Sequence, residues 1–389
     1  MFFLPALETA AQPVNSIDTG HFPEIEKINA ILIDFYNEHS LPGGISMAIS
    51  FNEKLVYAAS VGFADSEHNV PLTPEHRMRI ASLSKPITSI AVMKLMEENK
   101  INLNDIVLGE NGILGIEYGI PVYNNEPAQI TVRNLLEHTS GGWGNSREDP
   151  MAVISNKNGK ELIQDVLAKY PLENSPGSNF DYSNFGYYVL GKVIEKISGA
   201  SYENYVKENI LIPCGIDGMR IGSDTSGFGE TEYIRTSPNE TNPYHYSPRH
   251  YEASAGWIAN PLELIKLLAH VDSFPYIQDI LTNETIAVMT APSKENQDYA
   301  LGWYVDLRGN IWHNGSLPGA SAEMGRSSHG FNWAILINSR PQNGFVLRDL
   351  ESDRSQLIYL DFQEELNRLF WKIEEAIESW HDGIDLENF

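Results

Sequence analysis

The sequence predicts an α/β fold of the α+β kind, in which one antiparallel sheet is flanked by helices and interrupted by a mostly helical region. Three observations predict it. Two β-rich runs lie near the start of the 389-residue chain, at 45–51 and 54–61, and others lie far downstream, between 299 and 338. Amphipathic helical patterns open and close this framework. About 220 residues of helical pattern, turns and loops separate the two groups of strands.

Apolar spacing and turn residues define each element of the framework. The segment 24–39 has apolar residues at helical spacing and stops at Pro42-Gly43-Gly44, which predicts an amphipathic helix. Asn52-Glu53 joins the two early strands in a hairpin. Later strands are expected at 299–307, into Trp312, at 321–325 and at 331–338. A helical stripe over five turns from Phe362 to Trp380 must be buried against this sheet.

The inserted region is predicted to be mostly helical. Helices are expected at 84–99, 131–138, 160–169, 185–198, 201–210 and 261–270. We therefore expect a single unit over 1–389, made of a discontinuous α/β part (22–80 and 255–389), a helical and loop part (81–254) and an N-terminal extension (1–21).

Composition excludes several classes of protein. Lys and Arg number 27 and Asp and Glu 52, a net charge of −25, which repels nucleic acids and anionic membranes alike. A hydrophobic fraction of 42% excludes a disordered chain. The lone Cys214 forms no intramolecular disulfide and no cysteine-rich metal site. No apolar run is long enough to span a bilayer, so we expect a soluble protein with neutral, cationic or small-molecule partners.

The N-terminus leaves the compartment open. An apolar run at 2–7 followed by Thr9-Ala10-Ala11 is similar to an export signal, but the first basic residue is Lys27, so the charged leader of such a signal is missing. Periplasmic or secreted and cytoplasmic locations both fit the sequence. The sequence gives no indication of oligomeric state.

The first chemical motif is Ser82-Leu83-Ser84-Lys85. Pro86 and an apolar helical pattern follow it, so Ser82 lies at the start of a buried helix. Residues i and i+3 share a helical face, which brings the Lys85 amine within reach of the Ser82 hydroxyl. A lysine whose pKa is lowered from about 10.4 by burial can activate a serine nucleophile. The pattern alone is weak, and the alternative is an N-capping serine beside a surface lysine.

The second motif is Tyr182-Ser183-Asn184, which follows the turn Pro176-Gly177 and precedes the helix expected at 185–198. A tyrosine there could take the serine proton, as phenolate or as a hydrogen-bond relay, and pass it to a leaving group. Asn184 offers an amide to the lysine or to a substrate carbonyl. Ser183 and Asn184 also fit as helix N-caps, and Y-x-N recurs at Tyr123 and Tyr202.

The third motif is His313-Asn314-Gly315-Ser316 in the late strand region. Glycine on a strand permits close approach of a backbone or ligand. The backbone N–H of Ser316 could then form a two-donor oxyanion hole with that of Ser82. The alternative for His313 alone is a structural or surface histidine.

These motifs, in this order, resemble the serine β-lactamase and penicillin-binding-protein-like family, in the branch of class C β-lactamases, D-alanyl-D-alanine carboxypeptidases, D-aminopeptidases and related esterases. The resemblance covers roughly residues 24–340. Its motifs lie at 80–86, 135–142, 176–187, 255–257, 301–303 and 313–315.

The family resemblance implies a five-stranded antiparallel sheet with a helical subdomain and the site between them. It implies that Ser82 is the acyl nucleophile, that Lys85 and Tyr182 transfer protons and that Asn184 positions substrate. The backbone N–H groups of Ser82 and Ser316 would form the oxyanion hole. Chemistry would pass through a covalent acyl-enzyme without metal or organic cofactor.

The third motif departs from class C β-lactamases, which resemble this chain but have Lys-Thr-Gly where it has His313-Asn314-Gly315. A histidine supplies a cation only in part at neutral pH, so the sequence favours a small ester, amide or peptide substrate, including D-residue-containing ones, over a β-lactam. An acyltransferase, a peptide cyclase, a class C-like β-lactamase and, last, a non-catalytic binding scaffold are the alternatives.

Two loops are expected to carry substrate specificity. They are 143–153, which begins with Trp143, and the aromatic segment 242–251, which contains Tyr246. We expect Trp143, Tyr246, Asn314 and Gly315 to contact substrate. A plain surface loop is the alternative for 242–251.

Overall fold

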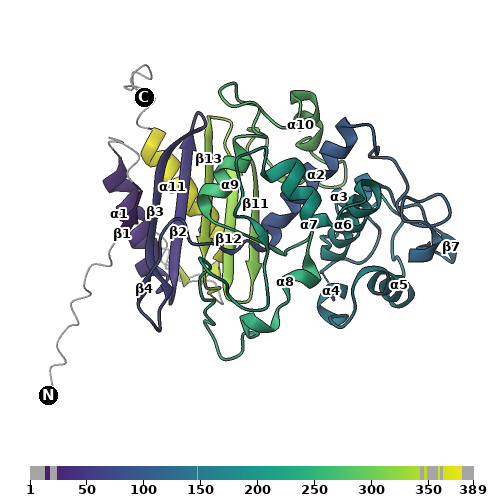
Figure 1. Cartoon of the computed structure of the whole chain (residues 1–389), viewed down its shortest axis with the longest axis horizontal. Coiled ribbons are helices and arrows are strands. Elements are labelled where there is room, and N and C mark those ends of the chain that lie inside the picture. The colour runs from purple at the N-terminus through teal and green to yellow at the C-terminus, as the bar shows by residue number, and fades with distance from the viewer. Residues whose placement is uncertain are drawn as a thin grey trace.

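The computed structural model describes residues 14–17, 24–146, 148–341, 346–347, 358–359 and 362–378, and it confirms the predicted fold class (Figure 1). Five long antiparallel strands form the centre of the sheet in the order β3-β2-β13-β12-β11. Their bounds are β2 Gly44–Phe51, β3 Lys54–Asp65, β11 Ile311–Leu317, β12 Ala320–Arg326 and β13 Phe331–Ile337. Short strands extend the sheet: β1 Val14–Ser16 and β4 Val70–Pro71 beside β3, and β10 Tyr304–Val305 beside β11.

Helices cover both faces of the sheet. On one face lie α1 (Ile25–Glu38) and α11 (Phe362–Glu378), whose apolar stripes pack on β2, β3 and β13 (Figure 1). The rings of Trp333 and Phe370 stack with centroids 3.6 Å apart at the centre of this layer. On the other face α9 (Pro261–Leu268) packs against β13 and β2. The strands alternate their side chains between these two apolar layers, as a sheet buried on both faces requires.

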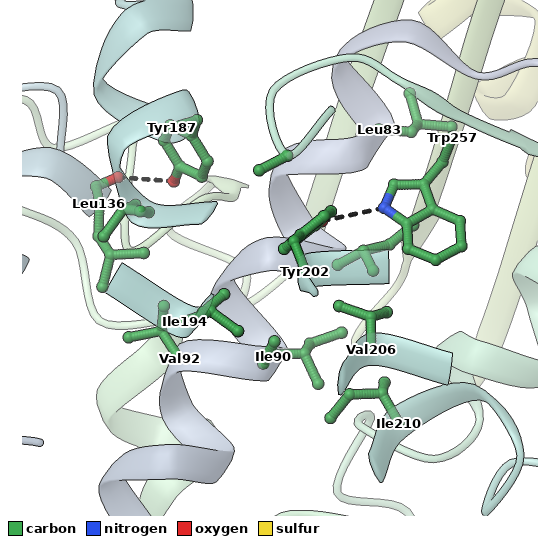
Figure 2. Close-up of a cluster of buried hydrophobic side chains, with 14 of the residues drawn as sticks. Leu83, Ile90, Val92, Leu136, Tyr187, Ile194, Tyr202, Val206, Ile210 and Trp257 are labelled. Atoms are coloured by element: carbon green, nitrogen blue, oxygen red, sulfur yellow. Dashed lines mark hydrogen bonds between the residues drawn. The ribbon is translucent and has the colours of Figure 1, made fainter. Parts of the chain in front are cut away.

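The helical part surrounds α2 (Ser84–Glu97), which lies beside the sheet edge (Figure 1). From Ser84 to Leu95, α2 is buried on all sides, and within this range only Lys94 is partly exposed. Figure 2 shows Ile90 and Val92 of α2 packed among Leu136, Ile194 and Val206 of the neighbouring helices. These helices are α3 Val132–Leu136, α4 Pro150–Val153, α5 Gly159–Lys169, α6 Asn184–Ser198, α7 Tyr202–Val206 and the π-helical turn η3 Lys207–Leu211.

The remaining elements are short. A small sheet of β5 Met78–Arg79, β9 Trp257–Ala259 and β8 Arg220–Ile221 leads into the 3-10 turn η1 Ala81–Leu83. The others are η2 Ile116–Tyr118, β6 Val122–Tyr123, β7 Glu126–Pro127, η4 Pro243–His245, α8 Pro248–Tyr251, α10 Asn283–Met289, β14 Val346–Leu347 and β15 Ile358–Tyr359. Among the described residues no helix is both long and apolar enough to cross a membrane.

The structure differs from the sequence predictions at several short elements. The strand expected at 299–307 is reduced to β10, because Gly302 has a φ of +86° and turns the chain while Tyr299 enters the core. Part of the N-terminal extension forms β1 on the sheet edge. The segment 242–251 is not a plain loop, since it contains η4 and α8. The division into two parts at residues 81 and 254 stays a prediction.

Candidate active site

Ser82 lies in η1, between β5 and α2, at the sequence position predicted for a helix start. The preceding residue, Ala81, has a φ of +50°, a left-handed conformation that costs a non-glycine residue roughly 1–3 kcal/mol. The surrounding contacts hold this turn in place. Ile80 N–H donates to Trp257 O at 3.1 Å, and Ser84 Oγ donates to Ala81 O at 2.7 Å. Ser82 itself remains partly exposed.

Lys85 lies on the first turn of α2 and is fully buried. Its Nζ lies 3.0 Å from Ser82 Oγ, 2.8 Å from Asn184 Oδ1 and 3.0 Å from the carbonyl oxygen of Ser254. Burial lowers the pKa of Lys85 to about 7, and the negative charge of Asp149 opposes this effect. The predicted proximity of Ser82, Lys85 and Asn184 is therefore present, and a large fraction of the lysine is uncharged at physiological pH.

Asn184 is the first residue of α6, and its side chain has a fixed orientation. Its Nδ2 donates to Asp149 Oδ2 at 2.7 Å, which directs Oδ1 toward Lys85. Its backbone N–H donates to Asn145 Oδ1 at 3.2 Å. Asp149 is itself held as the N-cap of α4, where it accepts the N–H of Met151. An Asp149–Asn184–Lys85 hydrogen-bond series therefore joins α4, α6 and α2.

Tyr182 lies just before α6, next to the lysine. The Lys85 Nζ is 4.6 Å from the centroid of the Tyr182 ring. The Tyr182 ring also packs against the imidazole ring of His138, and the two ring centroids are 4.3 Å apart. Burial raises the pKa of Tyr182 well above its ordinary value, although the Ser82 side chain favours the ionised form. The side chain is thus a neutral phenol at neutral pH.

His313 lies on β11 and is fully buried. Its Nδ1 is 2.6 Å from Asn314 O and its Nε2 is 3.2 Å from the hydroxyl of Tyr299. Burial and the positive charge of Lys85 lower the pKa of His313 to about 3. The sequence predicted that this histidine would be partly charged at neutral pH, whereas its buried position in the structure indicates that it is uncharged.

The strand β11 meets the Ser82 segment at Gly315. A Cβ on Gly315 would lie 2.5 Å from the carbonyl oxygen of Ile80 and 3.0 Å from Cβ of Ala81. The missing side chain therefore makes room for the chain's own backbone. Asn314 pairs with Glu323 across β11 and β12, and directly paired residues share a sheet face. Since Glu323 is buried on the α11 side, the Asn314 side chain lies on the face away from η1.

Ser316 is exposed on β11, one residue beyond the contact between Gly315 and the Ser82 segment. The segments that carry the two predicted oxyanion donors, Ser82 and Ser316, therefore lie side by side. The role of their N–H groups stays a prediction.

Trp143 and Tyr246 lie within packed clusters. The indole of Trp143 is buried against Phe185, with its Nε1 donating to Tyr170 O at 2.8 Å. Tyr246 is stacked on Tyr251, and its hydroxyl donates to Ala255 O at 3.2 Å. Both side chains expose less than a tenth of their surface, so any contact they make with a substrate is confined to a small area.

Sequence reasoning missed four groups that contact the site: the Asp149 carboxylate, the Ser254 carbonyl, His138 and Tyr299. Asp149 before Pro150 is an N-cap signature that the sequence displays. His138 lies in the segment 135–142, which carried the family resemblance without an assigned role. The Ser254 carbonyl belongs to the backbone and has no signature of its own.

The chain belongs to the serine β-lactamase and penicillin-binding-protein-like family of hydrolases. Its residues 28–358 match the family model described as Beta-lactamase. It is 27% identical to Penicillin-binding protein 4* of Bacillus subtilis (strain 168), over 69% of this chain and 62% of that protein. It is 29% identical to Protein flp of Staphylococcus aureus (strain MW2), over 46% of this chain and 36% of that protein. The chain thus spans less than two thirds of the length of these curated relatives.

Solved structures share the fold. The octameric penicillin-binding protein homologue from Pyrococcus abyssi superposes with a TM-score of 0.65 at 26% identity, over 81% of this chain and 74% of that one. D-amino acid amidase from Ochrobactrum anthropi SV3 superposes with a TM-score of 0.69 at 21% identity, over 92% and 99%. EstCE1, described as a hydrolase with promiscuous acyltransferase activity, gives 0.66 at 20% identity, over 81% and 93%. The last two likenesses concern the fold alone.

Proposed function

We propose that this protein is a serine acyl hydrolase that forms a covalent acyl-enzyme on Ser82. Its substrates are small esters, amides or peptides, including those with a D-residue. No metal or organic cofactor takes part in the proposed reaction. The structural neighbours include a D-amino acid amidase and EstCE1, described as a hydrolase with promiscuous acyltransferase activity; the argument for this chain rests on its own residues.

The observation that carries the proposal is the set of three partners around the Lys85 amine. A neutral lysine has two N–H groups and one lone pair. Asn184 Oδ1 and Ser254 O are acceptors only, so they take the two N–H groups. The lone pair is then left for the third partner, the Ser82 hydroxyl at 3.0 Å. With its pKa near 7, about half of Lys85 is in this form at neutral pH and can accept the serine proton.

The reaction then proceeds in balanced steps. The Ser82 hydroxyl gives its proton to Lys85 while its Oγ forms a bond to the acyl carbon, and the carbonyl becomes an oxyanion held by the N–H groups of Ser82 and Ser316. The bond from the acyl carbon to the leaving oxygen or nitrogen breaks, and that atom receives the proton from Lys85. Water then attacks the acyl carbon and gives a proton to Lys85. The bond between that carbon and Ser82 Oγ breaks, Lys85 returns the proton to Oγ, and the acid is released.

Tyr182 acts as a neutral relay in this scheme. Its raised pKa disfavours a tyrosinate at neutral pH, so a standing phenolate base is not required. The phenol lies beside the lysine and can pass a proton between Lys85 and the leaving group by giving one and taking another. This choice selects the relay from the two roles that the sequence allowed.

The neutral state of His313 limits which substrates the site is expected to bind. A cation at the third motif would bind a carboxylate on the substrate, but a buried histidine with a pKa near 3 carries no charge at neutral pH. Its Nδ1 proton is already donated to Asn314 O. We therefore favour acyl donors whose group near His313 is uncharged, such as neutral esters and amides, over β-lactams and peptides with a free terminal carboxylate.

Kinetics with matched substrates test the proposal. A chromogenic short-chain ester, a chromogenic β-lactam and a D-aminoacyl amide with and without a free carboxylate are compared on the wild-type chain. We expect turnover of the ester or neutral amide, and no gain in kcat/KM from the carboxylate. Efficient lactam turnover with the ester untouched would reverse the assignment. Product analysis with added amine or alcohol separates hydrolysis from acyl transfer.

Active-site labelling tests the nucleophile directly. A fluorophosphonate probe should label the wild-type chain and leave Ser82→Ala unlabelled. Ser66→Ala is a matched control, because Ser66 is an exposed serine on the turn after β3. Labelling that persists in Ser82→Ala would remove Ser82 from its role.

A further inference from the structure

Three fully buried polar side chains lie in contact behind Tyr182, and the proposed chemistry does not use them as proton donors or acceptors. They are His138, Tyr299 and His313, from three segments far apart in the sequence. His138 Nε2 lies 3.1 Å from the Tyr299 hydroxyl, which lies 3.2 Å from His313 Nε2. Buried polar groups are costly unless each is satisfied, so these contacts must agree in their proton positions.

The two ends of this series fix its direction. At one end the backbone N–H of Ser183 can only donate, and it donates to His138 Nδ1 at 3.0 Å. At the other end the carbonyl of Asn314 can only accept, and it accepts from His313 Nδ1 at 2.6 Å. A neutral imidazole has one donor and one acceptor nitrogen. His138 must therefore carry its proton on Nε2, and His313 on Nδ1.

Beside the Tyr187 hydroxyl, which donates to Leu136 O, the Tyr299 hydroxyl is the group that joins the two histidines. It accepts from His138 Nε2–H and donates to His313 Nε2. The result is four consecutive hydrogen bonds, all pointing from Ser183 to Asn314. Ser183 lies between Tyr182 and Asn184, and Asn314 lies between His313 and Gly315.

We propose that this one-way hydrogen-bond chain is a positioning device that fixes the Tyr182–Asn184 segment against β11, with Tyr299 as its central positioning residue. The inference rests on the proposed function, since it assigns the chain the task of aligning Tyr182 and Lys85 with the oxyanion donor on the strand. Both histidines serve as neutral connectors of opposite tautomer.

Charge is excluded from this chain by its surroundings. His138 is packed among the rings of Phe180, Tyr182, Tyr187 and Tyr299, and His313 among those of Tyr182, Tyr299 and Tyr304. Burial and the nearby positive charge of Lys85 lower the pKa of both histidines. A second proton on His138 would face the Ser183 N–H, which can only donate. A second proton on His313 would face the Tyr299 hydroxyl, which could then no longer donate to that ring.

Imidazole nitrogen NMR on the full chain labelled with ¹⁵N-histidine tests the chain without reference to activity. The signals are assigned with His138→Gln and His313→Gln. We expect His138 as the Nε2–H tautomer and His313 as the Nδ1–H tautomer, both unchanged from pH 8 to pH 5. The same tautomer in both rings, or a charge on either with a midpoint near pH 6.5, would overturn the inference.

Tyr299→Phe tests the positioning role, because it removes only the central hydroxyl. We expect kcat to fall at least tenfold with KM changed less than threefold, and at least one histidine to lose its single tautomer. Tyr57→Phe is the matched control, since Tyr57 is a buried tyrosine whose hydroxyl donates to Asn29 on the far side of the sheet. A Tyr299→Phe variant with the kcat of this control would refute positioning. Activity independent of Ser82 would refute the proposed function instead, while the tautomers would still report on the hydrogen bonds.

Discussion

Replacing Asp149 by Asn is the sharpest test of how the site sets the basicity of Lys85. The carboxylate accepts from Asn184 Nδ2, and the other atom of that amide accepts from Lys85 Nζ. Asparagine removes the negative charge and keeps one of the two acceptors: its Oδ1 can accept from Asn184 Nδ2, while the Met151 N–H, which uses the other carboxylate oxygen, loses its cap. Because this charge raises the pKa of Lys85, its removal should lower that pKa further.

The size of the effect follows from the path between the two charges. The hydrogen bonds of 2.7 and 2.8 Å, joined across the amide of Asn184, place the carboxylate within about 8 Å of the lysine nitrogen. At an effective dielectric constant of about 20, two unit charges at that separation interact by about 2 kcal/mol. Since 1.36 kcal/mol corresponds to one pH unit, the acidic limb of activity should move down by about 1.5 units.

The assay is kcat/KM for a neutral ester from pH 5 to 9, which reports the ionisation of the free enzyme. Lys85 acts when neutral, so wild-type activity should rise with pH through a midpoint near 7 and lose tenfold per unit well below it. Asp149→Asn should reach half of its plateau about 1.5 units lower, so at pH 6 it should keep about three quarters of its plateau against about a tenth for wild type, roughly an eightfold difference.

A matched charge control separates a local effect from a global one. Asp165 lies on α5 and pairs with Lys157 and Lys169, so Asp165→Asn removes the same charge from the chain at another place. This control should retain the wild-type midpoint. The reasoning is refuted if the Asp149→Asn midpoint stays in place or moves up, or if both variants move equally.

Two further predictions concern the sheet. Gly315→Ala would place a Cβ 2.5 Å from Ile80 O, so η1 must move off β11; we expect kcat to fall at least tenfold and stability by about 1–3 kcal/mol, measured by ester kinetics and urea unfolding. An unchanged kcat would contradict this account of Gly315. Burial raises the pKa of Glu323 to about 8, so the folded state holds a proton that the unfolded state releases above about pH 4.5. Stability should therefore fall between pH 5 and 8 by up to about 1.4 kcal/mol per unit, and Glu323→Gln, which still accepts from Trp333, should flatten this slope; equal slopes would refute it.

Long elements with a regular apolar period were predictable from the sequence. Four of the long strands, β2, β3, β12 and β13, follow from apolar spacing and turn residues, as do α1, α2, α6 and α11. The fifth, β11, was expected only as a short strand into Trp312, and it runs from Ile311 to Leu317. The short α8 and α10 escaped prediction. At four residues, α8 has too little periodicity to be recognised, and a tertiary contact, His250 Nε2 with Met151 O at 2.8 Å, helps to hold it.

The same distinction applies to the site. Ser82 and Lys85 are neighbours on one helical turn, so their contact could be predicted from spacing alone. Asp149, Ser254 and Tyr299 reach the site from distant segments, and their partners depend on how those segments pack. The charge of His313 was equally out of reach, because it depends on burial by residues that a sequence does not place. For Trp143 and Tyr246 the sequence could not show that their side chains are buried, and their contact with a substrate stays a prediction.

The packing of α2 connects the core to the proposed chemistry. The helix is buried around its circumference through Leu95, so Lys85 emerges from it into a dry environment where its charged form is disfavoured. The negative charge of Asp149 partly offsets the effect of burial, because it raises the pKa of Lys85. The low pKa of the base thus depends chiefly on burial, to which the rings of Tyr182 and Tyr187 beside its Nζ contribute. A core substitution that admits water beside α2 should raise the pKa of Lys85, and activity at neutral pH would then fall before the fold is lost.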